Sequence, residues 1–311
     1  MRELFLGEFI KNRRLELGLT QEQLCEGICE PITISRLENG KQTPSRNRIN
    51  ALLQRLGLPG ERYFALLSKN EKEVAALCKE IRAEKIRLNR AAEKERPVIQ
   101  RRLGERLAQL EDIVEPDDQI TQQNILKTKA FYEKHSPEEQ IEMLMRAIKM
   151  TVPNFDLEKI DQGLYSIGET NLINGIASVY LKMGKVRVSI DIYRQLLKYI
   201  EGHDRELAEY ARHFCLVAHN YAVALALEKR HEEAVELSER GWQICVEYGH
   251  YQFLPGFLAI IAECYYFMGE GDRAKEFYYQ AYYIYKAVRD ENSMNHIRKE
   301  MKEHLDLEIP S

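Results

Sequence analysis

The chain has 311 residues, of which 44% are hydrophobic and 30% are charged, and its formal net charge is −4. This composition is typical of a soluble globular protein and excludes a chain that is disordered or embedded in a membrane. No apolar run reaches the roughly 18 residues of a membrane-spanning helix, and the charged N-terminal segment does not resemble an export signal. We therefore expect a cytoplasmic protein that is long enough for two domains.

Charge is distributed unevenly along the chain. Residues 1–68 contain ten basic and eight acidic side chains, so this part carries +2 and the remainder carries −6. A basic part of this kind is compatible with contact to phosphates. The six cysteines occur singly, without the spacing of zinc ligands, so we predict no metal site and no cofactor. Cys25 and Cys29 are either a redox pair or, like the other four, small core residues in a reducing compartment.

The apolar pattern of residues 1–68 predicts four short helices. They are expected at residues 4–17, 21–26 and 32–38 and after Pro44. Thr20 and Gln23 have the spacing of a capping box, which marks the start of the second helix. Gly18, Gly27 and Asn39-Gly40 then separate the helices from one another.

Two short helices joined by a tight turn and packed among other helices form a helix-turn-helix, whose second helix enters the major groove of DNA. Its outward side chains are predicted to be Thr33, Ser35 and Arg36. Arginine can donate two hydrogen bonds to a guanine edge, and serine or threonine can contact other base edges. The predicted contacts to the phosphate backbone are Gln21 at a helix N-terminus and the basic residues Arg13, Lys41 and Arg46.

The segment LTQEQLCEGICEPITISRLENGKQTPS resembles the xenobiotic-response-element (Cro/C1-type) helix-turn-helix family. The residues that match the family pattern in order are Arg13, Leu19, Thr20, Gln21, Leu24, Ile34, Ser35, Glu38, Gly40, Pro44 and Ser45. The resemblance implies a DNA-binding domain over residues 1–68. The alternative is a helix-turn-helix that binds only protein.

Residues 69–120 consist almost entirely of helix-forming residues. Two apolar stripes occur in this segment, one through Val74 and Ile81 and one through Ile99 and Leu110, and Pro97 suits the first turn of a helix. We expect a helical linker hairpin here. Its basic residues alternate with glutamates, which favours a solvated face over a second DNA-binding patch.

Residues 121–311 contain weak internal repeats, each predicted to be a pair of helices. A large apolar residue stands nine positions before a small or apolar one in the pairs Tyr132/Ile141, Tyr180/Ser189, Leu225/Ala234 and Tyr265/Ala274. The clearest unit, AECYYFMGEGDRAKEFYYQAYYIY, resembles a tetratricopeptide repeat. Stacked pairs of this kind bury each other's apolar faces and form a superhelix with a concave groove. We therefore predict an all-α chain, with the helix-turn-helix followed by a tetratricopeptide-like right-handed α-superhelix.

The first helix of each repeat is expected to line the groove. The predicted groove residues are Gln123, Lys127, Asn171, Asn174, Ser178, His219, Asn220 and Glu263. Asparagine is unfavourable inside a helix, so three asparagines on one face suggest a role. An amide can donate to and accept from the backbone of an extended peptide. The alternative is that these asparagines are solvated or bridge neighbouring helices.

Taken as a whole, the chain resembles the peptide-pheromone-sensing regulators of Gram-positive bacteria grouped as RRNPP (Rap, Rgg, NprR, PlcR, PrgX). The resemblance implies a homodimer that binds double-stranded DNA and takes up a short signalling peptide in quorum sensing. From the geometry of such a dimer we expect the DNA site to be an inverted repeat. It also implies that Asn174 and Asn220 hold the peptide backbone. The alternative is a regulator whose repeats bind a partner protein. No catalytic motif is present in the sequence, so we expect no enzymatic activity.

Overall fold

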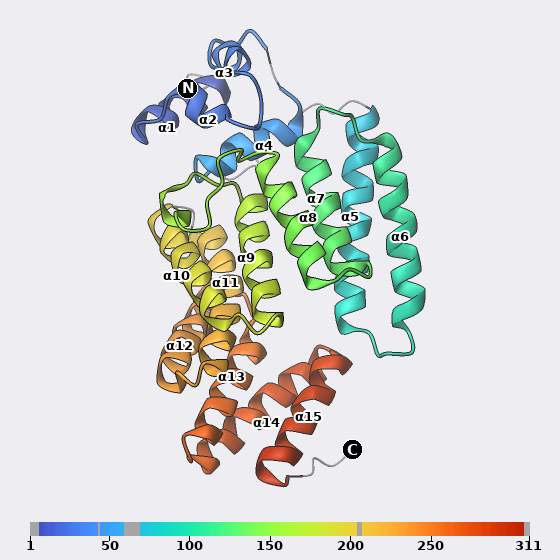
Figure 1. Ribbon diagram of the computed structural model, residues 1–311, viewed down its shortest axis with the longest axis vertical. Helices are drawn as coiled ribbons and strands as arrows, with labels where there is room; N and C mark the ends of the chain where they lie inside the picture. The colour runs from blue at the N-terminus through green and yellow to red at the C-terminus, as the bar shows by residue number, and fades with distance from the viewer. Residues whose placement is uncertain (1–5, 43, 59–68, 204–206, 308–311) are drawn as a thin grey trace.

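The computed structural model describes residues 6–42, 44–58, 69–203 and 207–307. Within these ranges all regular structure is helical, as the sequence predicts (Figure 1). None of the helices in the described ranges has both the length and the apolar character that crossing a lipid bilayer requires. The domain boundary predicted at residue 68 lies outside the described residues.

Residues 6–42 and 44–58 form a four-helix domain, which we call the head. Its helices are α1 (Leu6–Glu16), α2 (Gln21–Cys25), α3 (Pro31–Glu38) and α4 (Arg46–Arg55). The predicted capping box is confirmed, because Thr20 and Gln23 each accept a hydrogen bond from the other's backbone N–H. The head core includes Ile10, Leu24, Ile34, Leu37, Ile49, Leu52, Leu53 and Leu56. Leu15 is exposed instead, because five residues at about 100° each turn it away from Ile10.

The segment predicted as a linker hairpin contains the helices α5 (Lys69–Arg90) and α6 (Arg96–Ile113), which pack against each other. Its apolar stripes face each other and bury residues such as Ile81, Ile99 and Leu110. Ile125, from the first helix that follows, packs into the same cluster. The hairpin is therefore packed against the repeats and does not stand apart as a free spacer.

The repeat body contains four helix pairs and a terminal helix. The pairs are α7 (Gln119–Tyr132) with α8 (Pro137–Lys149), α9 (Ile167–Lys182) with α10 (Val186–His203), α11 (Leu207–Leu227) with α12 (His231–Tyr248), and α13 (Leu254–Phe267) with α14 (Gly271–Ala287). A 3₁₀ turn, η2 (Ile160–Gln162), precedes α9, and α15 (Glu291–Leu305) ends the array. Small residues allow close packing within the pairs: Ala177 is fully buried, and its carbonyl accepts a hydrogen bond of 2.8 Å from Ser189 Oγ.

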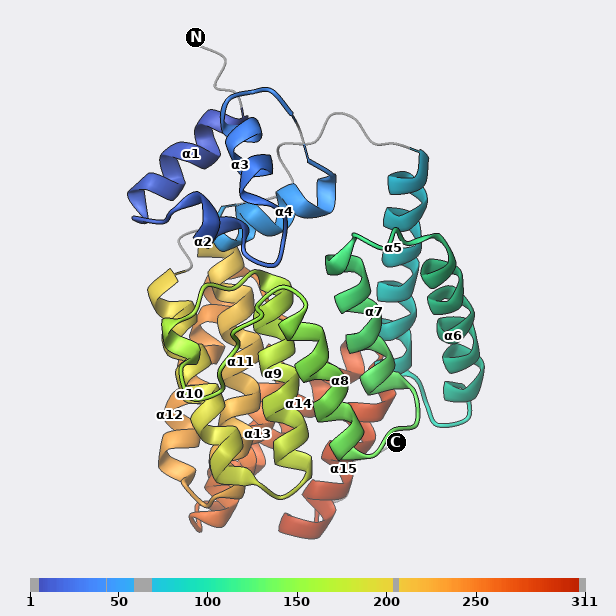
Figure 2. The same ribbon diagram turned by 45° about the horizontal axis from the view of Figure 1, so that its top comes forward.

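The first helices of the pairs are neighbours along the array, since α7 contacts α9, α9 contacts α11, and α11 contacts α13. The terminal helix α15 contacts α5 of the hairpin, so the two ends of the array meet (Figures 1 and 2). One hydrophobic core runs from α7 to α14, as expected for repeats that cannot bury their apolar faces alone. The array therefore curves around a space lined by α5, α7, α9 and α11.

The head sits on one end of the repeat body through α4, which contacts α7 and α9 (Figure 2). At this junction Arg55 Nη2 lies 3.0 Å from Glu169 Oε1, and both side chains are almost completely buried. Arg55 also donates to the carbonyls of Leu24, Glu26 and Thr151. Gly27 has a φ of +69°, and a Cβ there would lie 1.9 Å from the Thr151 carbonyl oxygen, so the close approach requires glycine.

Candidate nucleic-acid interface and ligand groove

The outward face of α3 carries Ile32, Ser35, Arg36 and Asn39. Arg36 and Asn39 are exposed, Ser35 is half-buried, and Ile32 is 56% exposed. Asn39 Nδ2 donates to the Ser35 carbonyl at 2.7 Å and so supports the last turn of the helix. An arginine, a hydroxyl and an aliphatic side chain on one face match the guanine edge, the other base edges and the thymine methyl of a major groove.

Thr33 does not share this outward face. Residues in a helix are about 100° apart, so Thr33 lies on the flank next to the buried Leu37. It is half-buried and lines a cavity together with Arg48 of α4. The sequence analysis grouped Thr33 with Ser35 and Arg36 and did not include Ile32, although helical spacing alone puts Ile32 between them.

The residues predicted to contact phosphates differ in their surroundings. The prediction for Arg13 is wrong: this side chain is only 7% exposed, donates to the Leu56 carbonyl at 3.0 Å and pairs with Glu16, so it ties α1 to the end of α4. Lys41 is exposed beyond α3, and Arg46 is the first residue of α4, with its side chain outside what the structure describes.

Gln21 is half-buried, and its Nε2 donates to Glu38 Oε2 at 2.7 Å. Glu38 also accepts two hydrogen bonds, of 2.6 and 3.0 Å, from the buried Arg14. Beside this carboxylate, the pKa of the Arg14 guanidinium is raised. The three side chains connect α1, α2 and α3 and thereby hold the recognition helix in position. Arg14 was not singled out by the sequence analysis, because a surface arginine and a buried one look alike in sequence.

The groove brings together residues of α9 and α11. Asn220 Nδ2 donates to Asn174 Oδ1 at 3.0 Å, and His219 Nδ1 lies 3.3 Å from Asn220 Oδ1. A Cβ at Gly256 would lie 2.6 Å from His219 Nε2, so glycine lets α13 approach the histidine. Burial lowers the pKa of His219, which favours the neutral ring. Ser178 is half-buried one turn further along α9.

A cavity of about 350 Å³ opens between the hairpin and the repeats, and Asn171, three residues before Asn174 on α9, lines it. Its lining includes the polar side chains of Arg82, Lys85, Asn124, Thr128, Asn171 and Arg212. Its apolar lining residues include Ile81 and Leu110. The lining residues contain three cations and no carboxylate. Asn171 lines this cavity, and its contact with a ligand stays a prediction; the sequence analysis did not select the hairpin residues, because they lie far away in the sequence.

Lys127 contributes further positive potential on the same side. Burial and the positive charge of Lys85 lower its pKa to about 7. The pKa of Lys85 is itself lowered by burial and by Arg82, and its Nζ lies 5.5 Å from the centre of the Tyr132 ring. Since no ion pair of Lys127 is present among the described residues, an anion would stabilise both lysines in their charged forms.

The other predicted groove residues lie elsewhere. Gln123 is only 3% exposed, and its Nε2 donates to the Ala147 carbonyl at 2.9 Å and to Thr151 Oγ1 at 2.8 Å, so it joins α7 to the end of α8 and the groove prediction is wrong. Glu263 is half-buried on α13, and burial together with nearby Glu300 raises its pKa. Two carboxyl groups, Glu263 and Glu300, thus lie near each other on α13 and α15, whereas the cavity at α5 and α7 is lined by cations.

Two family models match the chain. A helix-turn-helix domain matches residues 6–63, and the RNPP family C-terminal domain matches residues 153–305. None of the curated proteins matches the chain.

Several solved structures share the fold over almost the whole chain. Bacillus thuringiensis PlcR in complex with the peptide PapR7 and DNA is 19% identical, with 94% of this chain and 98% of that chain covered and a TM-score of 0.59. ComR from S. thermophilus, in complex with DNA and its signalling peptide ComS, is 14% identical, with 94% and 97% covered and a TM-score of 0.51. Apo ComR from Streptococcus vestibularis is 15% identical, with 96% and 97% covered and a TM-score of 0.52.

The chain is thus a helix-turn-helix protein with a tetratricopeptide-like repeat body. Residues 153–305 thus match the RNPP family C-terminal domain, and a helix-turn-helix domain precedes them in the chain.

Proposed function

We propose that the protein is a sequence-specific, DNA-binding transcriptional regulator, controlled in the cytoplasm by a short signalling peptide that binds in the groove, as in quorum sensing. The observation that carries the proposal is the Asn174–Asn220 pair. Two amides from successive repeats face each other at 3.0 Å. Each has further donor or acceptor capacity for the backbone of an extended peptide.

The electrostatics of the groove support a peptide as the ligand. The cavity beside Asn171 is lined by Arg82, Lys85 and Arg212, which suits a carboxylate such as an acidic side chain or the C-terminus of a chain. The carboxyl group of Glu263 on α13, near Glu300, suits an amine. A short peptide carries groups of both signs, so the groove matches a peptide better than it matches a neutral metabolite.

The geometry of α9 supports a coupling between ligand and DNA. Glu169, in the first turn of α9, holds Arg55 of the head, and Asn171 and Asn174 follow within the next turns of the same helix. A ligand that shifts α9 therefore acts on the junction that positions the head. We propose that two heads in a homodimer present their α3 helices to the half-sites of an inverted repeat, about one DNA turn apart or a multiple of it.

The test is an affinity selection in two arms. A pool of synthetic heptapeptides and a pool of random DNA duplexes are each incubated with the full chain, and the retained molecules are identified. The proposal predicts a small set of retained peptides, and duplexes with a shared inverted repeat whose binding changes when a retained peptide is added. Selection of DNA without any peptide would favour the alternative, in which the repeats bind a partner protein. Absence of DNA selection would contradict the proposal.

A further inference from the structure

The first turn of α4 is held by the loop between α6 and α7. Arg48 Nη2 lies 2.5 Å from Asp117 Oδ2 and 3.2 Å from the Asp117 carbonyl oxygen. The neighbouring Asn47 donates to Asp118 Oδ2 at 2.8 Å and to Thr121 Oγ1 at 2.9 Å. Asp118 also caps α7 by accepting from the Thr121 backbone N–H. The α6–α7 loop and the start of α7 therefore accept hydrogen bonds from two consecutive side chains of the head, Asn47 and Arg48.

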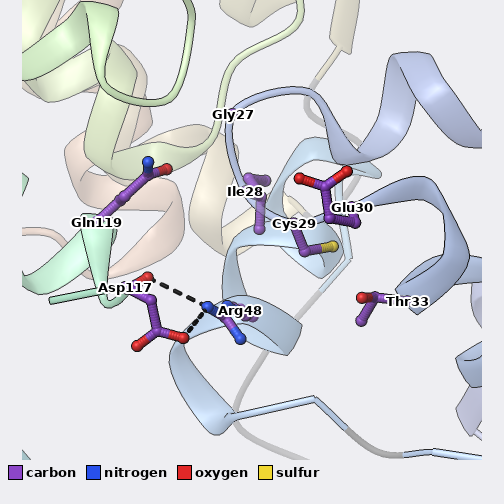
Figure 3. Close-up of a pocket in the computed structure, with 8 residues that line it drawn as sticks. All are labelled: Gly27, Ile28, Cys29, Glu30, Thr33, Arg48, Asp117 and Gln119. Atoms are coloured by element: carbon purple, nitrogen blue, oxygen red, sulfur yellow. Dashed lines mark hydrogen bonds and ion pairs between the residues drawn. The ribbon is translucent and has the colours of Figure 1, made fainter. Parts of the chain in front are cut away.

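Arg48 stands directly beside the recognition helix. Arg48, Asp117 and Thr33 of α3 line one cavity of about 290 Å³, and the Arg48 side chain lies between the other two (Figure 3). The Arg48 side chain is 28% exposed and that of Asp117 is 62% exposed, so solvent reaches the pair. Arg48 is thus a cation that the structure places next to α3, and the sequence analysis did not select it.

A phosphate suits this position for two reasons. A guanidinium binds a phosphate through the same N–H groups and with the same geometry as it binds a carboxylate. Arg48 also lies in the first turn of α4, where the helix dipole favours negative charge. When α3 enters a major groove, a DNA backbone runs along its flank, and the flank with Thr33 is the side that faces Arg48.

We propose that Arg48 binds a DNA phosphate, and that Asp117 of the repeat body occupies the place of this phosphate while DNA is absent. The inference rests on the proposed DNA binding. Arg48 Nη2 already donates to two oxygens of Asp117, and the Asp117 carboxylate repels an approaching phosphate. DNA binding therefore exchanges the Arg48–Asp117 contact for an Arg48–phosphate contact, while Asn47 keeps α4 against α7. Because the pair is exposed, it is weak enough to be exchanged.

The exchange can be measured without knowledge of the operator, because a phosphate contact reads no bases. The probe is a duplex of arbitrary sequence, about 30 base pairs long to span two half-sites. For Asp117→Asn in the full chain, we expect about three- to tenfold tighter binding at low salt, and for Arg48→Gln a comparable weakening with a salt slope smaller by about one. Asp112→Asn, at an exposed position near the end of α6, makes the same change of charge and serves as the matched control.

The double variant separates exchange from long-range charge effects. If Asp117 competes for Arg48, the gain from Asp117→Asn is lost in the Arg48→Gln background. A gain of equal size in both backgrounds, or an equal gain from Asp112→Asn, overturns the inference. If the wild-type chain binds the duplex and Arg48→Gln binds equally well, only this inference fails. If the wild type binds no duplex at any salt concentration, the proposed function fails. Thermal unfolding of each variant verifies that it is folded.

Discussion

The head and the groove present their polar side chains in different ways. On the head, Ile32, Ser35 and Arg36 project from one helix and are separated by at most four positions in the sequence. In the groove, Lys85 of α5 and Asn171 of α9 line one cavity, and Asn174 of α9 meets Asn220 of α11, only because the helices stack. A recognition helix can therefore be changed residue by residue, whereas each groove residue depends on the packing of several others. The junction at Arg55 connects these two kinds of surface.

The strongest test of this connection is Glu169→Ala. It leaves the buried guanidinium of Arg55 without its carboxylate, which typically costs about 3–5 kcal/mol of unfolding free energy. Urea denaturation of the full chain measures the loss. Glu169→Gln keeps an acceptor for the Ser166 backbone N–H, so its loss of unfolding free energy should be smaller.

The exposed Arg48–Asp117 pair provides the contrast: Asp117→Asn should change stability by less than about 1 kcal/mol. If Glu169→Ala and Asp117→Asn lowered the unfolding free energy equally, the Arg55–Glu169 pair would not be a buried anchor of the junction.

In the groove, the double variant Asn174→Ala and Asn220→Ala should weaken a peptide selected by the wild type about 10- to 100-fold, since each lost hydrogen bond contributes about 0.5–1.5 kcal/mol. Titration calorimetry measures the affinity. DNA binding without peptide should stay as in the wild type, since neither residue lies in the head. Asn292→Ala, exposed on α15, is the control. Undiminished peptide affinity would remove the amide pair from the site.

On the head, Arg36→Ala should cost about 1–3 kcal/mol at a single base pair and relax specificity there. Competition gel shifts with selected duplexes that differ at one position test this. Ile32→Ala should have a smaller effect that is confined to a thymine-containing position. Arg13→Ala should instead lower stability, because Arg13 is buried in the head. If Arg36→Ala weakens all sequences equally, Arg36 contacts phosphate and not a base.

A further effect is expected on the pH dependence of stability, and near neutral pH it is small. The pKa of Lys127 is about 7 in the folded chain, below its ordinary value of 10.5. Between these pH values the unfolded chain binds one more proton than the folded chain does, so the contribution of Lys127 makes stability rise with pH. Lys127→Met should flatten this rise in denaturation experiments. Lys129→Met, which removes a lysine paired with Glu111 on the surface, should keep the wild-type slope. A slope unchanged by Lys127→Met would place this lysine in solvent.

Sequence reasoning succeeded where neighbouring residues decide the outcome. The capping box at Thr20, the stripe of α4 and the hairpin with Pro97 in its first turn were all predicted, and the structure contains them. It failed where distant segments compete for a side chain. Arg13 and Gln123 have the polarity of surface residues, but each finds backbone partners on another helix. Arg48 and Asp117 were not selected, since they are 69 residues apart and unremarkable separately.

The sequence by itself determined the helices, their order and the helix-turn-helix pattern, because helix periodicity, capping and turn chemistry act over a few residues. Only the tertiary structure decided which polar side chains face solvent. It turned Thr33 toward Arg48, paired Asn174 with Asn220, and brought Lys85 near Lys127. The physical reason is that burial and electrostatic potential depend on distances between helices, and stacking sets these distances across segments that the chain separates widely.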